Sequence, residues 1–166
     1  MVDIDPLTEL TIKLSRQTLT AKDKYAAICR CVLQCVPKTN RVSLWKFDDS
    51  RCAIHCLMLL DECGKPEQPE IVLTQTQYPD YFSAIIQRET VSASDARNHP
   101  DTRCFAKDYF PNNDIHSMLD FIFHQDFRPV GIICCESVGK QVEWDSKDES
   151  MLRRTASIVS MFFDDK

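Results

Sequence analysis

Two apolar runs in the last third of the chain constrain its fold more than any other feature. The segments SMLDFIFH (117–124) and VGIICCES (130–137) are rich in the β-branched and aromatic residues that favour strands. A short charged turn joins them, formed by Gln125, Asp126, Phe127 and Arg128. Two strand-like runs separated by so short a turn predict an antiparallel hairpin, and the apolar character of both runs places it at the centre of a sheet.

Further strand patterns precede this hairpin. The runs RVSLWKF (41–47) and AIHCLMLL (53–60) are joined by the turn Asp48-Asp49-Ser50, which predicts a second antiparallel hairpin of buried strands. After a loop that contains two prolines and a glycine, IVLTQTQ (71–77) is typical of an edge strand. Residues 90–93 are expected to form one more short strand.

Helix signals occupy the remaining segments. Each predicted helix begins at a side chain that can cap its amino end or at a proline that fits its first turn. These starts are Asp5-Pro6, Thr20, Pro79, Pro100 and Asp145, with the fourth helix ending before Pro111 and the last spanning 147–163. The third helix is expected to cover the sheet with Tyr81, Phe82, Ile85 and Ile86. The order of elements predicts a mixed α+β domain.

Composition limits the classes of protein to which the chain can belong. A chain of 166 residues with 43% apolar residues and a net charge of −5 suits one globular domain. Binding to nucleic acid needs a concentrated basic face, and the basic runs here, such as Arg153-Arg154, are short and flanked by acids. No apolar stretch approaches the ~20 residues that span a bilayer, and the N-terminal segment MVDIDPLTEL is acidic, unlike a secretory signal. We therefore expect a cytoplasmic protein that binds no nucleic acid and spans no membrane.

The order of elements, together with the phrases SLWKFDD, SDARNHP, HSMLDF and PVGIICCES, resembles the GAF family along nearly the full chain. GAF domains are sensory modules of bacterial signalling proteins such as sensor kinases and diguanylate cyclases. The resemblance implies a single domain over 1–166, with helices at 1–37, sheet and pocket at 41–139, and a last helix at 145–163. It also implies an α+β fold with a central six-stranded antiparallel sheet. The N- and C-terminal helices cover one face of this sheet, and a ligand pocket with short helices lies on the other.

The same resemblance implies a regulatory function without catalysis. A small molecule in the pocket would change the packing of the terminal helices, which pass the signal to an output module on the same or another chain. The sequence leaves the ligand and any cofactor unknown. The residues expected to line the pocket are Trp45, Phe82, Phe105, Tyr109, His116 and Met118, an aromatic-rich set suited to a flat or apolar molecule. For His116 three interpretations stay open: a hydrogen-bond partner of a ligand, a haem ligand, or a partly exposed side chain at a strand end.

The last helix carries two neighbouring apolar stripes, Met151, Ile158 and Phe162 in one and Leu152, Ala156, Val159 and Phe163 in the other. One stripe can cover the sheet. The second either pairs with another copy of the chain in a homodimer or is covered by the first two helices of the same chain. The sequence stops at Asp164-Asp165-Lys166 without an output domain, which is typical of a fragment or of a sensor that acts on a separate partner.

The nine cysteines are odd in number and lie inside apolar segments, which predicts reduced core thiols in a reducing compartment. A metal site is disfavoured because a helix turns Cys29 away from Cys31 and Cys35. In the predicted strand, Cys134 and Cys135 point to opposite faces of the sheet and cannot bind one ion.

Other functions found in the family are alternatives to the ligand sensor. The domain is alternatively a dimerisation module whose pocket is filled by its own side chains. Free methionine sulfoxide reductases of the family carry catalytic cysteines in the region that here reads CGKPEQPEIVLTQTQYPD, where Cys63 alone remains. Bilin-binding relatives attach pigment through a cysteine next to a histidine, and here the corresponding pair, His55-Cys56, has the reverse order.

Asp120 interrupts an otherwise apolar strand, between Leu119 and Phe121. A buried carboxylate needs a partner, and Arg97 or Arg103 is the expected one. If Asp120 is not buried, it is an ordinary solvent-facing strand residue.

Overall fold

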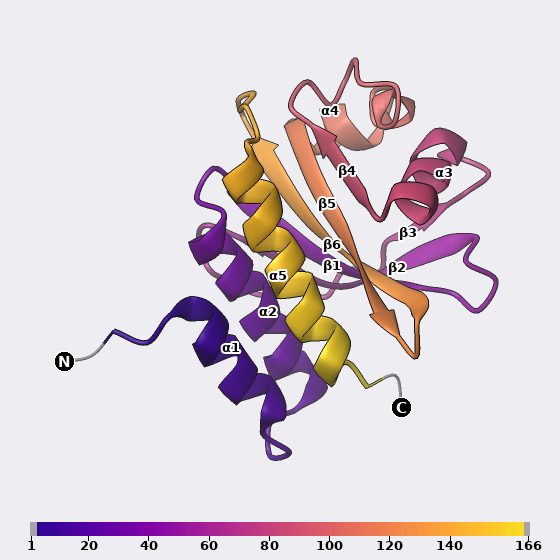
Figure 1. Cartoon of the computed structure of the whole chain (residues 1–166). Helices are drawn as coiled ribbons and strands as arrows, with labels where there is room; N and C mark the ends of the chain where they lie inside the picture. The colour runs from indigo at the N-terminus through magenta and orange to yellow at the C-terminus, as the bar shows by residue number, and fades with distance from the viewer. Residues whose placement is uncertain (1–2, 165–166) are drawn as a thin grey trace.

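The computed structural model describes residues 3–164, so Met1, Val2, Asp165 and Lys166, at the two ends of the predicted domain, lie outside the described residues. One antiparallel sheet has the strand order β3-β2-β1-β6-β5-β4 (Figure 1). Its strands are β1 (Arg41–Phe47), β2 (Ala53–Asp61), β3 (Val72–Thr74), β4 (Thr90–Ala93), β5 (Ile115–Gln125) and β6 (Arg128–Val138). The predicted α+β fold with a six-stranded antiparallel sheet is confirmed.

The hairpin of β5 and β6 lies at the centre of the sheet, as predicted, with β4 on one side and β1 on the other. Gln125 pairs with Arg128, so the loop has two residues, Asp126 and Phe127. Their φ angles are 51° and 63°, the left-handed values that a tight hairpin of this length requires. The register of the pair shifts between Phe123 and His124, so the turn and this irregularity together set which side chains of β5 and β6 share a face.

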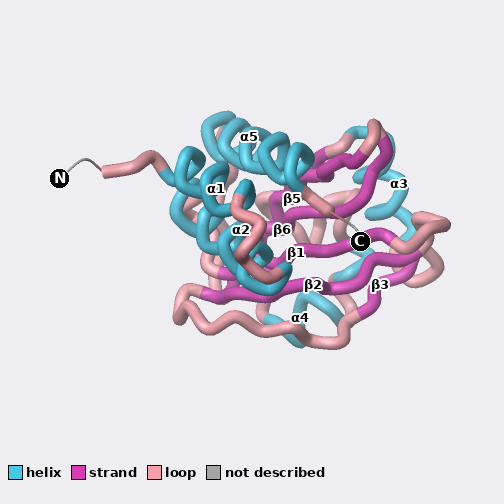
Figure 2. Tube along the Cα trace, turned by 90° about the horizontal axis from the view of Figure 1, so that it is seen from below, coloured by secondary structure: helices cyan, strands magenta, loops and turns pink. Residues whose placement is uncertain are grey.

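Three helices cover one face of the sheet, namely α1 (Pro6–Ser15), α2 (Ala21–Cys35) and α5 (Ser146–Phe162) (Figure 2). Their first turns are capped as the sequence predicts: Asp5 accepts from the Thr8 N–H at 3.1 Å, and Thr20 accepts from the Asp23 N–H at 3.1 Å. Asp145 and Asp148 form a reciprocal capping box at the start of α5.

The core beneath these helices, called here the helix-side core, includes Leu119, Phe123 and Cys135 of the sheet and one stripe of α5, formed by Leu152, Ala156 and Val159. Met151, Ile158 and Phe162 of the second stripe are half-buried and pack against the same core. Phe163 stacks on Tyr25 of α2, with ring centroids 6.3 Å apart. Helices of the same chain therefore cover part of the second stripe, and the homodimer stays a prediction.

The opposite face is covered by α3 (Pro79–Arg88), a short 3-10 turn η1 (Arg103–Phe105) and α4 (Tyr109–Asn113). Figure 1 shows these elements across the sheet from the terminal helices. The predicted helix from Pro100 to a point before Pro111 is wrong. The segment forms η1 and then α4, which contains Pro111 in its first turn, where the missing N–H has no helical acceptor to lose.

Two smaller expectations also differ from the structure. Ile86 of α3 is exposed and takes no part in covering the sheet. The edge strand β3 has three residues, fewer than the run at 71–77 suggested. Among residues 3–164, none of the helices combines the length and apolar character needed to cross a membrane.

Candidate functional site

The core between the sheet and α3, η1 and α4, called here the aromatic core, is dominated by stacked rings. The Phe105 ring lies at its centre, with centroid distances of 4.3 Å to Tyr78, 5.1 Å to Tyr81, 5.5 Å to Tyr109 and 5.3 Å to Phe110. These spacings fall in the range in which tilted and edge-on ring pairs attract. The side chains of the domain therefore fill the centre of this region.

Of the side chains predicted to line a ligand pocket, most lie together in the aromatic core: Trp45, Phe82, Phe105, Tyr109 and Met118, each no more than 7% exposed. The exception is His116, which is half-buried at the start of β5. Its Nε2 lies 2.9 Å from Oδ1 of Asp114, in the turn that precedes the strand. The role of these six residues as ligand contacts stays a prediction.

Asp120 is 1% exposed and points from β5 into the aromatic core. Its Oδ2 accepts a hydrogen bond from the Tyr81 hydroxyl of α3, and Cys134 lies directly across from it on β6. The prediction that Arg97 or Arg103 would be its partner is wrong. Arg97 instead donates through Nε to a backbone carbonyl of β5, at 2.9 Å. A phenol and a thiol, rather than a cation, therefore surround the carboxyl group.

Glu136 of β6 is a second buried carboxyl group that the sequence did not single out as a site residue. Its Oε1 accepts from Nη1 of Arg41 at 2.9 Å, and both side chains are buried. The guanidinium of Arg41 also lies over the Tyr109 ring, 5.9 Å from its centroid. The two-residue period of β6 could have indicated this placement, because it puts Glu136 on the same face as Cys134.

The strand register brings the two carboxyl groups close together. Cys134 pairs with Asp120 on one side and with Ser43 of β1 on the other. Two residues further along β6, Glu136 pairs with Met118 and Arg41 in the next row. Asp120 and Glu136 are thus diagonal neighbours on adjacent strands, a separation of roughly 7–8 Å in an antiparallel pair.

Each of these carboxyl groups retains one oxygen without a partner among residues 3–164. Asp120 Oδ1 and Glu136 Oε2 are buried and accept no hydrogen bond. The buried hydroxyl of Tyr109 also makes no hydrogen bond of good geometry, although Arg41 lies beside it. An unpaired buried acceptor costs about 1–3 kcal/mol, so each is a place where a bound donor would gain free energy.

Burial also changes the acidity of both groups. It raises the pKa of Asp120 to about 8, although the hydrogen bonds of Cys134 and Tyr81 oppose the change. It raises the pKa of Glu136 to about 7, because removal from water outweighs the attraction of Arg41. Near neutral pH both carboxyl groups can therefore exchange a proton, as perturbed groups at functional sites often do.

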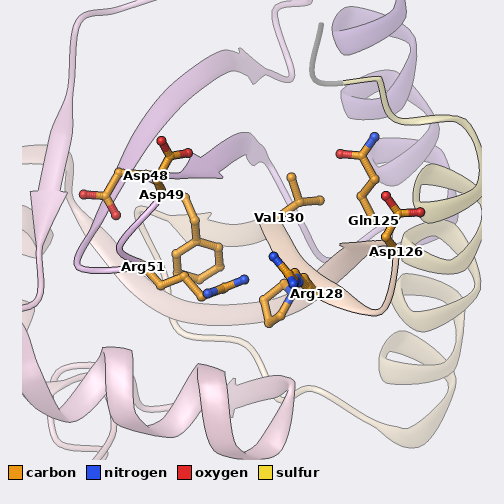
Figure 3. Close-up of a pocket in the computed structure, with 9 residues that line it drawn as sticks. Asp48, Asp49, Arg51, Gln125, Asp126, Arg128 and Val130 are labelled. Carbon is orange, nitrogen blue, oxygen red and sulfur yellow. The ribbon is translucent and has the colours of Figure 1, made fainter.

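A separate polar cleft of about 560 Å³ lies at the tips of the two hairpins (Figure 3). Arg51 and Arg128 point toward one another across it, and Asp48 lies at its far side. The Asp48 carboxylate is already occupied within its own turn, where it accepts from the Cys52 N–H at 2.9 Å. None of the six predicted pocket residues lines this cleft.

The family model of the GAF domain matches residues 38–162. The chain belongs to the GAF family. The match covers all six strands, α3, α4 and α5 but not α1 and α2, so it includes both the aromatic core and the sheet face that carries the buried carboxyl groups. No curated protein matches this GAF domain in sequence.

Solved structures of other GAF domains share its fold. The GAF domain of a phosphoenolpyruvate-protein phosphotransferase from Coxiella burnetii has 14% identity and a TM-score of 0.73, with 95% of this chain and 89% of that chain covered. A methyl-accepting chemotaxis protein has 12% identity and a TM-score of 0.72, with 92% and 93% covered. The chromophore-binding domain of Stigmatella aurantiaca phytochrome P1 has 10% identity and a TM-score of 0.72, with 96% and 59% covered. Domains of this family are generally regulatory modules of signalling proteins, and identities this low show a shared fold alone.

Proposed function

We propose that this GAF domain is a cytoplasmic regulatory sensor of a bacterial signalling protein. A small molecule binds at the buried carboxyl groups beneath α3 and α4, and the terminal helices pass on the change. One observation carries the proposal: Asp120 Oδ1 and Glu136 Oε2 are buried acceptors without a hydrogen-bond partner among residues 3–164. Native domains leave few such groups unpaired, and those that persist are associated with binding or catalysis.

The chemistry of the two oxygens defines the class of ligand. At neutral pH a pKa of about 8 leaves Asp120 mostly protonated, whereas Glu136, with a pKa of about 7, is in part ionised. Together the two groups suit a compact molecule that both accepts a hydrogen bond and offers N–H or O–H donors. The rings of Phe105 and Tyr109 suit a flat apolar part of the same molecule. Because these rings fill the region, binding requires η1 and α4 to move outward and to give up part of the packing around Phe105.

The sheet connects this site to the terminal helices. Asp120 faces the aromatic core, whereas its neighbour Leu119 belongs to the helix-side core. At the end of the same strand, the His124 N–H donates to Oγ of Ser160 on α5 at 2.9 Å. A shift of β5 on ligand binding therefore reaches α5 through packing and through this hydrogen bond. α5 then passes the change to an output module on the same or another chain.

A homodimer formed through the terminal helices is part of the proposal. Met161 of α5 is 68% exposed, and Phe162 beside it is half-buried, so apolar surface remains near the end of the helix. We expect Phe162→Glu to halve the mass of the oligomer, measured by light scattering, while the circular dichroism spectrum stays unchanged. A variant with the mass of the wild-type protein would contradict this contact. The cytoplasmic location is supported by the nine cysteines, all of which are free thiols.

The dimerisation module without a ligand is the second candidate. The packing of four rings around Phe105 favours it, because side chains of the domain occupy the centre of the aromatic core. A methionine sulfoxide reductase function rests on Cys63, which is exposed. If that function is present, the activity should vanish in Cys63→Ser.

Native mass spectrometry of protein purified gently from cells tests the sensor against the dimerisation module. We expect the wild-type protein to retain a small molecule that Asp120→Ala loses, because alanine offers neither a hydrogen-bond donor nor an acceptor at this position. Asp126→Ala, in the exposed hairpin turn, is the matched control and should retain the molecule. A wild-type mass equal to that of the bare polypeptide would contradict ligand retention and favour the dimerisation module.

A further inference from the structure

Cys31 and Cys35 form a pair of thiols on α2 that the sensor function does not use. They are separated by one helical turn, and their Sγ atoms lie 3.9 Å apart. We propose that this pair is a peroxide-reactive dithiol, and that its oxidation to a disulfide changes the end of α2 and, through Lys38, the start of α5. The site lies in the helical layer, on the opposite side of the sheet from the buried carboxyl groups.

Cys31 lines a cleft of about 80 Å³ between α1 and α2, together with Lys13 and Arg30 among others. Cys35 does not line this cleft and is reached through Cys31, whose Sγ lies 3.9 Å away. A cleft of this volume has room for a molecule of the size of hydrogen peroxide. The chemical class of oxidant that fits is therefore a small hydroperoxide.

The two thiols share one hydrogen bond, which separates their acidities. It lowers the pKa of Cys35, with Arg154 of α5 acting in the same direction and burial and Asp5 acting against it. The same hydrogen bond and burial raise the pKa of Cys31, so one thiolate is favoured at the pair. Burial raises the pKa of Cys29 and Cys135, which therefore stay protonated. Because the thiolate is the reactive form of cysteine, this pair should react before those buried thiols.

The oxidation balances with hydrogen peroxide as the one co-reactant. The Cys35 thiolate takes the proton of Cys31 across the 3.9 Å contact, and the Cys31 sulfur attacks one oxygen of a peroxide in the cleft. An S–O bond forms, the O–O bond breaks, and the hydroxide released takes up a proton to become water. Cys35 sulfur then attacks the sulfenic sulfur of Cys31, so that an S–S bond forms and the S–O bond breaks. The hydroxyl group leaves with the Cys35 proton as a second water. Two thiols are oxidised and one peroxide is reduced.

The disulfide cannot form in an undisturbed helix. Residues four apart in a helix have Cβ atoms about 5–6 Å apart, whereas a disulfide requires roughly 3.5–4.5 Å. Cys35 is the last residue of α2, and Pro37 follows two positions later. Unwinding of the last turn brings the two sulfurs together, and it breaks the hydrogen bond from the Val36 N–H to the Val32 carbonyl, which is 2.9 Å long.

The segment that would move is tied to α5. Lys38, three residues after Cys35, donates through Nζ to the Glu143 carbonyl at 2.6 Å. The same nitrogen binds Oδ2 of Asp145 at 3.0 Å and Oδ2 of Asp148 at 2.9 Å, the two acids of the capping box. Displacement of Lys38 therefore weakens the amino end of α5. Oxidation becomes a second input to the helix that the proposed sensor uses, and it does not depend on a ligand in the aromatic core.

The first test uses the unaltered protein. Trypsin cleavage after Arg30 and Lys38 releases the peptide CVLQCVPK, which contains Cys31 and Cys35 and no other cysteine. After brief treatment with hydrogen peroxide and then alkylation, we expect this peptide to lose both alkylation sites and to weigh less by two hydrogen atoms. If it keeps both alkylatable thiols after the exposed Cys52 and Cys63 have been oxidised, the proposal is overturned.

Hydrogen exchange tests the transmission to α5. Oxidised wild-type protein should exchange faster than reduced protein at residues 145–150, and thiol reduction should reverse the change. Cys35→Ser treated with the same peroxide should show no difference, whereas Cys52→Ser should behave like the wild type. A disulfide that forms without any change in exchange at 145–150 would overturn the role of Lys38.

Discussion

Asp148 on the helical side of the sheet and Asp120 on the other side are both buried carboxyl groups, yet their surroundings differ. Asp148 Oδ2 binds the Lys38 ammonium at 2.9 Å and accepts from the Asp145 N–H at 3.0 Å. Asp120 meets the Tyr81 hydroxyl and no cation, and its Oδ1 has no partner among residues 3–164. The burial of Asp148 is thus explained by its part in capping α5. The burial of Asp120 is not explained by a contribution to the stability of the fold.

The same contrast extends to the two cores. The helix-side core consists mainly of aliphatic side chains and thiols from the terminal helices and the sheet. The aromatic core is rich in rings from α3, η1, α4 and the sheet, and it lies against a sheet face that carries two carboxyl groups with raised pKa values. Buried polar groups without partners beneath an aromatic layer favour ligand binding on this side of the sheet.

The largest expected effect on stability comes from a substitution at the centre of the aromatic core. Phe105→Ala should lower the free energy of unfolding by about 3–5 kcal/mol, because it removes a fully buried ring that contacts four others. Urea unfolding measures the change. Phe127→Ala is the control, since its side chain is 101% exposed in the hairpin turn, and it should stay within about 0.5 kcal/mol of the wild type. A loss below about 1 kcal/mol for Phe105→Ala would show that this side of the sheet is not a packed core.

Gly131→Ala probes the point where the two cores meet. A Cβ at this position would overlap the Phe123 ring on the helical side and the backbone oxygen of Trp45 in β1. The ring can rotate, but the backbone oxygen cannot move without disturbing the pairing of β1 with β6. We expect a loss of about 3 kcal/mol in unfolding free energy, at the upper end for overpacking. Unchanged stability would mean that β1 and β6 are less closely paired than the structure shows.

The pH dependence of stability sharpens the comparison of the two aspartates. Asp120 has a pKa of about 8 when folded and about 4 when unfolded, so the folded state holds the proton more tightly. Its contribution to stability is complete below pH 4 and is lost as the pH rises through 8. Asp120→Asn should therefore remove about 2 kcal/mol of the decline in unfolding free energy between pH 6 and 8.

Asp126→Asn, in the exposed turn of the same hairpin, is the control for this pH series and should leave the decline unchanged. Equal pH profiles for wild type and Asp120→Asn would contradict a raised pKa at Asp120.

The smallest effect concerns the connection between β5 and α5. Ser160→Ala removes the acceptor of the His124 N–H and should cost about 1 kcal/mol in chemical unfolding. Ser157→Ala is a matched control on the same helix, because that hydroxyl is exposed and bonds only to the Arg153 carbonyl of its own helix, at 3.0 Å. A Ser160 variant as stable as the Ser157 variant would argue against this hydrogen bond as a part of the relay.

The sequence predicted local features well because their causes are local. The hairpin of β5 and β6 followed from two β-rich runs joined by a short charged turn, and the start of α1 followed from Asp5 and Pro6. The segment around Pro111 was harder, since proline is compatible both with the residues after a helix and with a first helical turn.

The partners of the buried carboxyl groups could not be predicted in this way. Tyr81 and Asp120 are 39 positions apart, and Arg41 and Glu136 are 95 apart. Their contacts depend on the register of the sheet and on the position of α3. Neither of these can be predicted from the residues that surround each side chain in the sequence. Arg97 or Arg103 was expected as a partner because a buried carboxylate needs a cation, but Asp120 accepts from Tyr81 of α3, and Arg97 donates to a backbone carbonyl of β5.

Carboxyl carbon NMR of the ligand-free protein, titrated from pH 4 to 9, observes the two buried acids directly. Asp120→Asn and Glu136→Gln assign the two signals. The predicted result is a midpoint of about 8 for Asp120 and about 7 for Glu136, because both groups are held out of water with incomplete hydrogen bonding. Midpoints below about 5 for both groups, near those of exposed carboxylates, would contradict a buried site with unpaired acceptors beneath α3 and α4.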